Sequence, residues 1–520
     1  MKKKEIKKEG SGRYLKKFVV EKIRAESTEI KEGFIKKYKI KSENVELYVE
    51  IIKEKGKILQ YKLSIPQVTD ATHALLDELK RELIVEVAIT TTEILDPNII
   101  EKLKQKFRER ADVLLSEKFK LEPLMRQFLI SILLHDMVGL GEIEFLLNDP
   151  DLEEIVIMSA NEPVRVYHKN YGWMETNIYV KQEAQIQNYS NIIARRVGRQ
   201  ITTLTPLLDA HLVSGDRANA VFYPIATKGN TLTIRKFARD PWTMVDFIQN
   251  KTCSAEVFAL LWLAIQYELN VLISGGTASG KTSLLNVCMP FIPPNHRIVS
   301  IEQTRELQLP QFLYWCPLTI RQPNPEGKGE VSMLDLVVNS LRMRPDRIIL
   351  GEIRRKEEAE VLFEAMHTGH SVYATVHANN IHETIQRLIN PPISVPANLL
   401  SAVNLNVVMF RDRRLGLRRV YQVGEYLAAE EAEKFTIRSQ LIYRWKPETD
   451  TIVQHSTIVR LFEDLSRHTG MTQQEIDDDL ATKKKILNWL VKNNMRSLEQ
   501  VSEIVKDYYL NQDALLKRVK

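Results

Sequence analysis

One segment of eight residues, GGTASGKT at positions 275–282, restricts the possible folds of this 520-residue chain more than any other. It fits the pattern G-x-x-x-x-G-K-[ST]; the apolar run NVLIS precedes it, and a helical pattern begins at Lys281. In this context the glycines allow backbone N–H groups to turn inward around a phosphate, and the helix start adds positive potential. The segment therefore predicts a phosphate-binding loop between a buried strand and a helix.

Residues of this loop have expected roles toward a nucleoside triphosphate. Lys281 reaches the β- and γ-phosphates, and the Thr282 hydroxyl is offered to Mg²⁺. The residues expected to bind the nucleotide here are Gly275, Gly276, Thr277, Ala278, Ser279, Gly280, Lys281, Thr282 and Ser283. We therefore expect ATP and Mg²⁺ as the ligands.

Strands and helices alternate from Ser254 onward, which predicts an α/β fold with a parallel sheet covered on both faces. The carboxyl ends of parallel strands lie at one edge, where ligands bind. Glu302 ends the strand RIVSI, Glu352 follows RIIL, and His377 follows SVYATV, so all three are expected beside the loop. Glu302 would orient the attacking water, and Glu352 would hold Mg²⁺ through its hydration shell.

Three histidines, His367, His370 and His377, have a spacing that could form a zinc site. No cysteine lies near them, and His377 ends a strand. The favoured interpretation is that His370 and His377 sense the γ-phosphate, with plain packing as the alternative.

Composition and charge restrict the class of protein. Hydrophobic residues make up 44% and charged residues 27% of the chain, the balance of a folded globular protein. Three cysteines lie far apart without a CxxC pair, which excludes a four-cysteine zinc module and argues against a disulfide framework. No apolar run reaches the roughly 18 residues of a membrane span. We expect a cytoplasmic protein that associates with the membrane through partners.

The net charge of +6 is carried by the first 20 residues, which hold seven Lys, one Arg and two Glu. A nucleic-acid-binding protein is usually basic beyond its tail, so nucleic acid is not the expected partner. The basic segment is expected to touch acidic lipid headgroups or a partner, or to form a solvated arm.

Four motifs resemble, in order and spacing, those of the ATPases of type II and type IV secretion, tight-adherence pili, type IV pili and the archaellum. Besides the Walker A loop at 275–282, they are an acidic box, a Walker B segment and a histidine box: IVSIEQTRELQLP (298–310), RMRPDRIILGEIR (342–354) and TGHSVYATVHA (368–378). Residues 207–237 resemble the end of the family's N-terminal domain. The resemblance covers residues from about 149 to 425. The overall character of the sequence favours an archaeal origin.

The chain departs from the family pattern at two positions. Gln303 stands where the acidic box usually has Asp, and Arg355 stands where Asp usually follows the Walker B segment. Gln303 can hydrogen-bond water but brings no charge to the metal shell. Since Glu302, Glu306 and Glu352 are retained, ATP hydrolysis to ADP and phosphate is still expected.

The resemblance implies a homohexameric ring, and it implies that successive segments of the chain form separate domains. The expected segments are a variable basic region at 1–75, an α+β N-terminal domain at 76–238, a hinge at 239–252, a RecA-type ATPase domain at 253–455 and a C-terminal helical subdomain at 456–520. In the ring, the N-terminal domain of each subunit would pack on the ATPase domain of the next. Arg217 and Arg235 match N-terminal-domain arginines that approach the nucleotide phosphates in the family.

The expected function is that of a motor. Sequential closing around the ring would act on a polytopic membrane platform protein and power a pilus-like filament or secretion. Two alternatives remain open: a nucleic-acid translocase or helicase on the same core, and a non-hydrolysing, nucleotide-gated scaffold.

Overall fold

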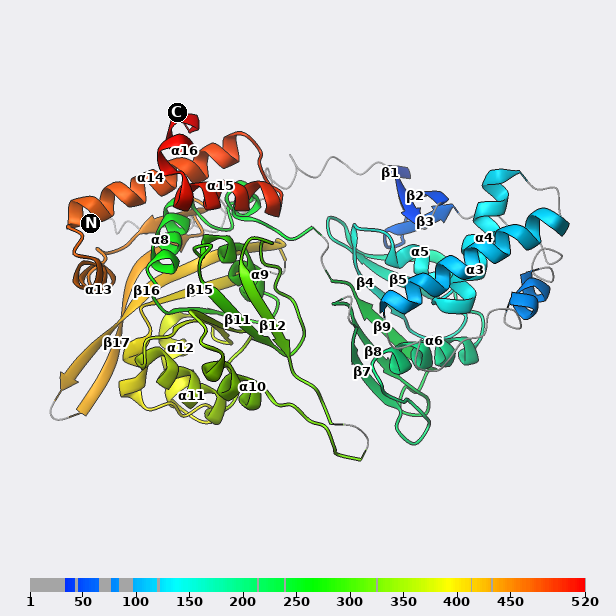
Figure 1. Cartoon of the computed structure of the whole chain (residues 1–520), viewed down its shortest axis with the longest axis horizontal. Helices are drawn as coiled ribbons and strands as arrows, with labels where there is room; N and C mark the ends of the chain where they lie inside the picture. The colour runs from blue at the N-terminus through cyan, green and yellow to red at the C-terminus, as the bar shows by residue number, and fades with distance from the viewer. Residues whose placement is uncertain are drawn as a thin grey trace, which may run out of the picture. The chain divides into compact units, whose positions relative to one another are not determined.

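The computed structural model describes residues 33–42, 45–64, 76–83, 97–118, 122–212, 215–237, 240–323, 326–412, 414–431 and 434–519. The chain forms two compact units, residues 1–239 and 240–520. Each unit has its own nine-stranded sheet and its own hydrophobic core (Figure 1). Of the variable basic region expected at 1–75, residues 1–32, 43–44 and 65–75 lie outside the described residues.

Unit 1 is built on a sheet with the strand order β1-β2-β3-β6-β5-β4-β9-β8-β7. The strands are β1 (Gly33–Ser42), β2 (Val45–Lys53), β3 (Gln60–Ser64), β4 (Leu152–Ile157), β5 (Pro163–His168), β6 (Gly172–Tyr179), β7 (Leu207–His211), β8 (Arg217–Val221) and β9 (Thr231–Arg235). The helices are an unlabelled one at 76–83 and α3 (Pro97–Lys118), α4 (Pro123–Val138), α5 (Ile143–Leu147) and α6 (Glu183–Arg196). Strands β3 and β6 pair in parallel, so residues 33–64 extend the sheet that carries β4 to β9.

A buried carboxylate fastens the first strands to the rest of unit 1. Asp149 is fully buried, and its Oδ2 accepts hydrogen bonds of 2.7 Å from the hydroxyls of Tyr38 on β1 and Tyr61 on β3. Hydrogen bonds to a charged acceptor are stronger than neutral ones, so this contact holds the two strands in place.

Unit 2 is an α/β fold of the RecA type with the strand order β12-β11-β13-β14-β10-β15-β16-β17-β18. The strands are β10 (Val271–Gly275), β11 (Arg297–Glu302), β12 (Tyr314–Thr319), β13 (Arg347–Leu350), β14 (Ser371–Val376), β15 (Leu405–Asp412), β16 (Leu417–Glu431), β17 (Lys434–Lys446) and β18 (Thr451–Gln454). The first six strands in this spatial order pair in parallel; they are β12, β11, β13, β14, β10 and β15. From β15 the sheet continues through β16, β17 and β18 as an antiparallel extension.

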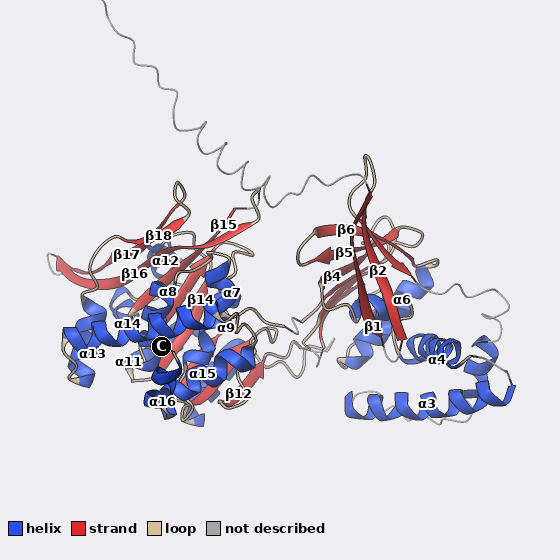
Figure 2. Cartoon of the chain, turned by 90° about the horizontal axis from the view of Figure 1, so that it is seen from above, coloured by secondary structure: helices blue, strands red, loops and turns tan. Residues whose placement is uncertain are grey.

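Helices cover both faces of this sheet, as the continuous burial of the central strands β10, β13 and β14 requires (Figure 2). The helices are α7 (Met244–Gln249), α8 (Ala255–Gln266), α9 (Lys281–Cys288), α10 (Met333–Ser340), α11 (Lys356–His367), α12 (Ile381–Ile389), α13 (Arg460–Thr469), α14 (Gln473–Lys492), α15 (Leu498–Leu510) and α16 (Gln512–Arg518), with 3₁₀ turns at Met289–Phe291, Leu341–Met343 and Ala397–Ala402. On β10, Leu272 packs with α10, α11 and α12, whereas its neighbours Val271 and Ile273 pack with α8, α9 and the C-terminal helices.

Helix starts follow the capping signals of the sequence. The Ser254 hydroxyl accepts the Val257 N–H at the start of α8, and capping boxes begin α14 at Thr472 and α15 at Ser497. The expected hinge contains the short helix α7, whose Met244, Val245 and Phe247 are buried in the core of unit 2.

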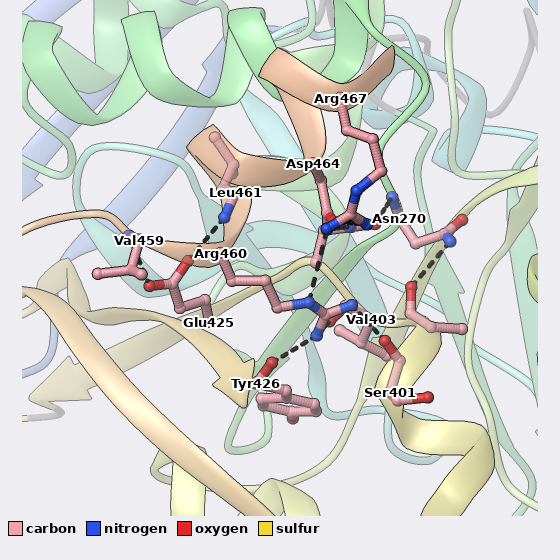
Figure 3. A network of polar contacts seen from close by, with 12 residues as sticks. Asn270, Ser401, Val403, Glu425, Tyr426, Val459, Arg460, Leu461, Asp464 and Arg467 are labelled. Atoms are coloured by element: carbon pink, nitrogen blue, oxygen red, sulfur yellow. Dashed lines mark hydrogen bonds and ion pairs between the residues drawn. The ribbon is translucent and has the colours of Figure 1, made fainter. Parts of the chain in front are cut away.

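A network of buried polar contacts joins α13 to the amino-terminal edge of the sheet (Figure 3). Glu425 on β16 is fully buried and accepts hydrogen bonds of 3.0 Å from the N–H groups of Val459 and Leu461. Arg460 donates to the carbonyl oxygens of Ser401, Val403 and Tyr426. Helix α13 is thereby held against β16 and against the segment that leads into β15.

Among the described residues, the structure contains no helix that is both long and apolar enough to cross a membrane.

Candidate nucleotide site

The Walker A loop connects the buried strand β10 to helix α9. Gly275 has φ +155° and Gly280 has φ +96°, backbone conformations that favour glycine. A Cβ on Gly275 would lie 2.4 Å from the Ser279 Oγ and 2.7 Å from the Met409 carbonyl oxygen, so the loop has no room for a side chain there. Ser279 is buried and donates to the Gly276 carbonyl at 2.8 Å, while Thr277, Ala278 and Ser283 are exposed.

Lys281 folds back over this loop. Its Nζ donates to the carbonyl oxygens of Gly275 and Gly276, both at 3.1 Å, and lies 3.3 Å from His377 Nδ1. Burial is the largest influence on Lys281 and lowers its pKa, against the attraction of Glu352 and Glu306. An ammonium group held this way is placed to exchange backbone carbonyls for phosphate oxygens.

The structure brings His377 and Glu352 to the same edge as Lys281. His377 Nε2 lies 3.2 Å from Glu352 Oε1. Because an ammonium donates to Nδ1, the proton of the neutral imidazole belongs on Nε2, where it faces the carboxylate. Burial, and then Lys281, lowers the pKa of His377, in agreement with a neutral ring. Lys281, His377 and Glu352 therefore form one continuous chain of contacts across the tips of β10, β14 and β13.

Glu302 lies at the tip of β11, next to β13. Its Oε1 accepts the backbone N–H groups of Glu306 at 2.9 Å and Leu307 at 3.1 Å. Its Oε2 is buried and has no hydrogen-bond partner among the described residues. The side chain is only 2% exposed, and burial raises its pKa to about 7. An acceptor oxygen poised between the neutral and charged forms suits a group that takes a proton from water.

Arg354, which the sequence did not mark as functional, also enters the site. Arg354 donates from Nη2 to Glu352 Oε2 at 2.7 Å and from Nη1 to Gln303 Oε1 at 2.6 Å. The hydrogen bond to Glu352 is the largest influence on Arg354 and raises its pKa. The signal for Arg354 was its place two residues after Glu352, since alternate residues of an extended chain share a side.

His370 is not brought to the Walker A loop. It precedes β14, whereas His377 follows that strand, so the two lie at opposite ends of the sheet, about 23 Å apart at 3.3 Å per residue. The His370 ring lies 3.4 Å from the Thr368 hydroxyl. The two histidines are far apart because His370 comes directly before the extended strand β14 and His377 directly after it.

Arg217 and Arg235 lie directly opposite one another on the neighbouring strands β8 and β9 of unit 1. Arg217 is half-buried and its guanidinium binds both oxygens of Asp209, at 3.1 and 3.0 Å. Arg235 is exposed and lies opposite Glu154 of β4. Their contact with a nucleotide stays a prediction.

The residues expected to hold Mg²⁺ fit this ion. Thr282 and Glu352 are partly exposed and offer a hydroxyl and a carboxylate, the oxygen donors that Mg²⁺ prefers. The described residues contain no group of three His, Cys, Asp or Glu side chains placed to hold a metal. An ion at this edge would therefore take its remaining ligands from water and from the phosphates of the nucleotide.

Comparisons with known proteins agree on one family. The family model of the type II/IV secretion system protein matches residues 156–415. The uncharacterized protein MJ0900 of Methanocaldococcus jannaschii is 35% identical over 401 residues, which cover 75% of this chain and 71% of that protein. The type IV secretion system protein PtlH of Bordetella pertussis is 30% identical over 301 residues, covering 51% of this chain and 88% of PtlH.

Solved structures from such systems also match. The crystal structure of the VirB11 ATPase from the Brucella suis type IV secretion system, in complex with sulphate, is 25% identical and covers 53% of this chain and 90% of that one, with a TM-score of 0.28. The family match over half of the sequence, together with the identity to MJ0900, shows that this chain belongs to the type II/IV secretion system protein family.

Proposed function

We propose that this protein hydrolyses ATP to ADP and phosphate. The observation that carries the proposal is the chain of contacts from Lys281 through His377 to Glu352, at 3.3 and 3.2 Å, beside a glycine loop shaped for phosphate. Phosphoryl transfer needs positioned charges more than covalent chemistry, and these side chains supply them at one edge of one sheet.

Each side chain has a role in the proposed reaction. Backbone N–H groups of the Walker A loop and Lys281 hold the phosphates, and Glu302 orients the attacking water and accepts its proton. Thr282 and the hydration shell of Glu352 would hold Mg²⁺, which neutralises charge on the β- and γ-phosphate oxygens. His377 lies between Lys281 and Glu352, where it would sense whether a γ-phosphate is present.

The proposed role of hydrolysis is mechanical work in a homohexamer. Family membership supports a motor that acts on a polytopic membrane platform protein, from the cytoplasmic side, to assemble a type IV pilus-like filament or to drive secretion. Arg217 and Arg235 would reach the phosphates when unit 1 closes over unit 2. Acidic lipid would be a further contact of the basic N-terminal segment.

A phosphate-release assay on the purified full-length protein tests this proposal. Lys281→Ala should abolish hydrolysis, because the loop loses the charge that faces the β- and γ-phosphates. Lys356→Ala is the matched control, since this exposed lysine at the start of α11 pairs with Glu360. A wild-type rate in Lys281→Ala would show that the site is assigned wrongly.

Added ligands distinguish the alternatives. Stimulation by acidic lipid or a platform protein supports the motor, whereas stimulation by DNA or RNA supports a translocase. Nucleotide binding without phosphate release in the wild type would instead identify a nucleotide-gated scaffold, the alternative that Gln303 and Arg355 leave open.

A further inference from the structure

Both carboxylate oxygens of Glu352 are occupied by neighbouring side chains. Oε2 accepts the Arg354 hydrogen bond at 2.7 Å, and Oε1 faces His377 Nε2 at 3.2 Å. A metal ion or its bound water needs these same oxygens. The guanidinium of Arg354 thus forms an ion pair with the same carboxylate that we propose to hold Mg²⁺.

Arg354 has space to leave this position. Its side chain is 56% exposed, whereas that of Glu352 is 20% exposed, so the guanidinium can move into water while the carboxylate stays at the tip of β13. The sheet fixes Glu352, because Gly351 N–H donates to the Ile301 carbonyl at 2.9 Å and the Gly351 carbonyl accepts the Thr375 hydroxyl at 2.6 Å.

Gln303 holds the second branch of the same guanidinium. Its Oε1 accepts Arg354 Nη1 at 2.6 Å, so Arg354 bridges the tips of β11 and β13. The amide is neutral, and hydrogen bonds between an ion and a neutral group hold less tightly than bonds between two ions. A carboxylate at this position would bind the guanidinium with a second full charge.

We propose that Arg354 is a positioning residue that occupies Glu352 until Mg²⁺ arrives, and that Gln303 holds it there weakly enough for the ion to displace it. This inference rests on the proposed function, because it takes Glu352 as the residue that binds Mg²⁺ through water. Arg354 then keeps the carboxylate aimed at the site before nucleotide binds, and it competes with the ion.

Binding of Mn²⁺, a paramagnetic substitute for Mg²⁺, tests the competition directly. Electron paramagnetic resonance of the full-length protein with ADP gives the half-saturating Mn²⁺ concentration. Removing the competitor in Arg354→Gln should lower this concentration about two- to fivefold, the range of a partly exposed ion pair. Gln303→Ala, which leaves Arg354 in place but loosens it, should lower it by less.

The neighbouring Arg355 provides the matched control. Arg355→Gln removes the same charge one residue away, and Arg355 is the exposed residue before α11. An equal shift in Arg355→Gln would mean that overall charge, and not displacement, sets the affinity. No shift in Arg354→Gln, weaker binding in it, or no Mn²⁺ binding in any form would each overturn the proposal.

Glu352→Gln separates this inference from the proposed function. In that background Arg354→Gln should have no effect on Mn²⁺ binding, and a persisting effect would overturn the inference. Absence of ATP hydrolysis in the wild type, with the Mn²⁺ shifts intact, would remove the proposed function and leave the competition standing.

Discussion

At the scale of the residue, Glu302 is the group whose chemistry is most altered by its surroundings. It is 2% exposed, one of its oxygens accepts two backbone N–H groups, and the other is buried without a partner among the described residues. Loss of water penalises the charged form more than two hydrogen bonds favour it, so its pKa is raised to about 7. Function and stability then place opposite demands on one carboxyl group.

The stability cost predicts the behaviour of Glu302→Gln. Since the folded-state pKa is raised from 4.5 to about 7, the stabilisation from the buried neutral acid is fully present below pH 4.5 and is lost as pH rises through 7. Glutamine stays neutral and can keep both backbone hydrogen bonds. The variant should be more stable than the wild type by about 3 kcal/mol at pH 8, at 1.36 kcal/mol per pKa unit, with little difference at pH 5.

Denaturant unfolding of both proteins at the two pH values measures this difference. Glu306→Gln, on the neighbouring exposed residue, is the control and should behave as the wild type does. An equal effect of Glu302→Gln at pH 5 and pH 8 would contradict the burial of a titrating carboxyl group.

The same pKa predicts the pH dependence of catalysis. As a base, Glu302 must be ionised, so kcat/KM for ATP should rise with pH and level off above about pH 7. Glu302→Gln should lower kcat/KM by about 10² or more and remove this rise, because a positioned base contributes roughly 10²–10⁴. A wild-type profile that is flat between pH 5.5 and 8 would exclude Glu302 as the base.

The residues that could be predicted from the sequence are those fixed by local rules. A strand followed by a polar residue places Glu302, Glu352 and His377 at one edge, because parallel strands end together. The same rule, applied to the residue before a strand, separates His370 from them. The contact of Arg354 with Gln303 joins two strand tips 51 positions apart, and such a pairing is set by strand order, which no local pattern gives.

At the scale of the element, helix α13 begins without a capping side chain of its own. The side chain of its N-cap residue Val459 cannot accept a hydrogen bond, and the N–H groups of Val459 and Leu461 donate to Glu425 on β16 instead. The capping boxes of α14 and α15 were readable from sequence because both partners lie within one turn. The cap of α13 was not, because its acceptor lies 34 positions away.

Because Glu425 caps α13 from another element, we expect Glu425→Ala to lower the stability of the protein strongly. Two N–H groups would lose their acceptor inside the protein, which costs about 2–4 kcal/mol of stability. Hydrogen exchange should speed up over Arg460–Thr469 ahead of α14. Glu463→Ala, on an exposed residue of the same helix, is the control and should change exchange little. Unchanged protection of α13 in Glu425→Ala would show that apolar packing alone holds the helix.

At the scale of the whole molecule, each unit has a hydrophobic core of its own. The segment where unit 2 begins is fastened to the C-terminal helices: Arg496 binds Asp240 and Asp246, both at 2.9 Å, and its carbonyl accepts the Thr243 hydroxyl. These contacts fasten Asp240, Thr243 and Asp246 to the rest of unit 2, so most of the segment proposed as a hinge at 239–252 belongs to unit 2.

Two units with separate cores suit a mechanism in which one unit delivers a charge to a nucleotide held by the other. Of the two arginines proposed for this task, Arg217 is already bound by both oxygens of Asp209, whereas Arg235 is exposed at the carboxyl end of β9. Arg235→Gln should lower kcat by about 10³-fold, the lower range for an arginine that stabilises charge on a transferring phosphoryl group. ATP affinity should change far less, because that charge develops only in the transition state.

Arg165 of β5 provides the matched arginine for this experiment, since it is half-exposed on the same sheet and pairs with Glu175 at 3.0 Å. Arg165→Gln should leave both kcat and ATP affinity unchanged. Steady-state phosphate release and equilibrium binding of a fluorescent ATP analogue give the two quantities. A wild-type kcat in Arg235→Gln would mean that unit 1 contributes no charge to the reaction, and coupling between the units would then have to arise from packing alone.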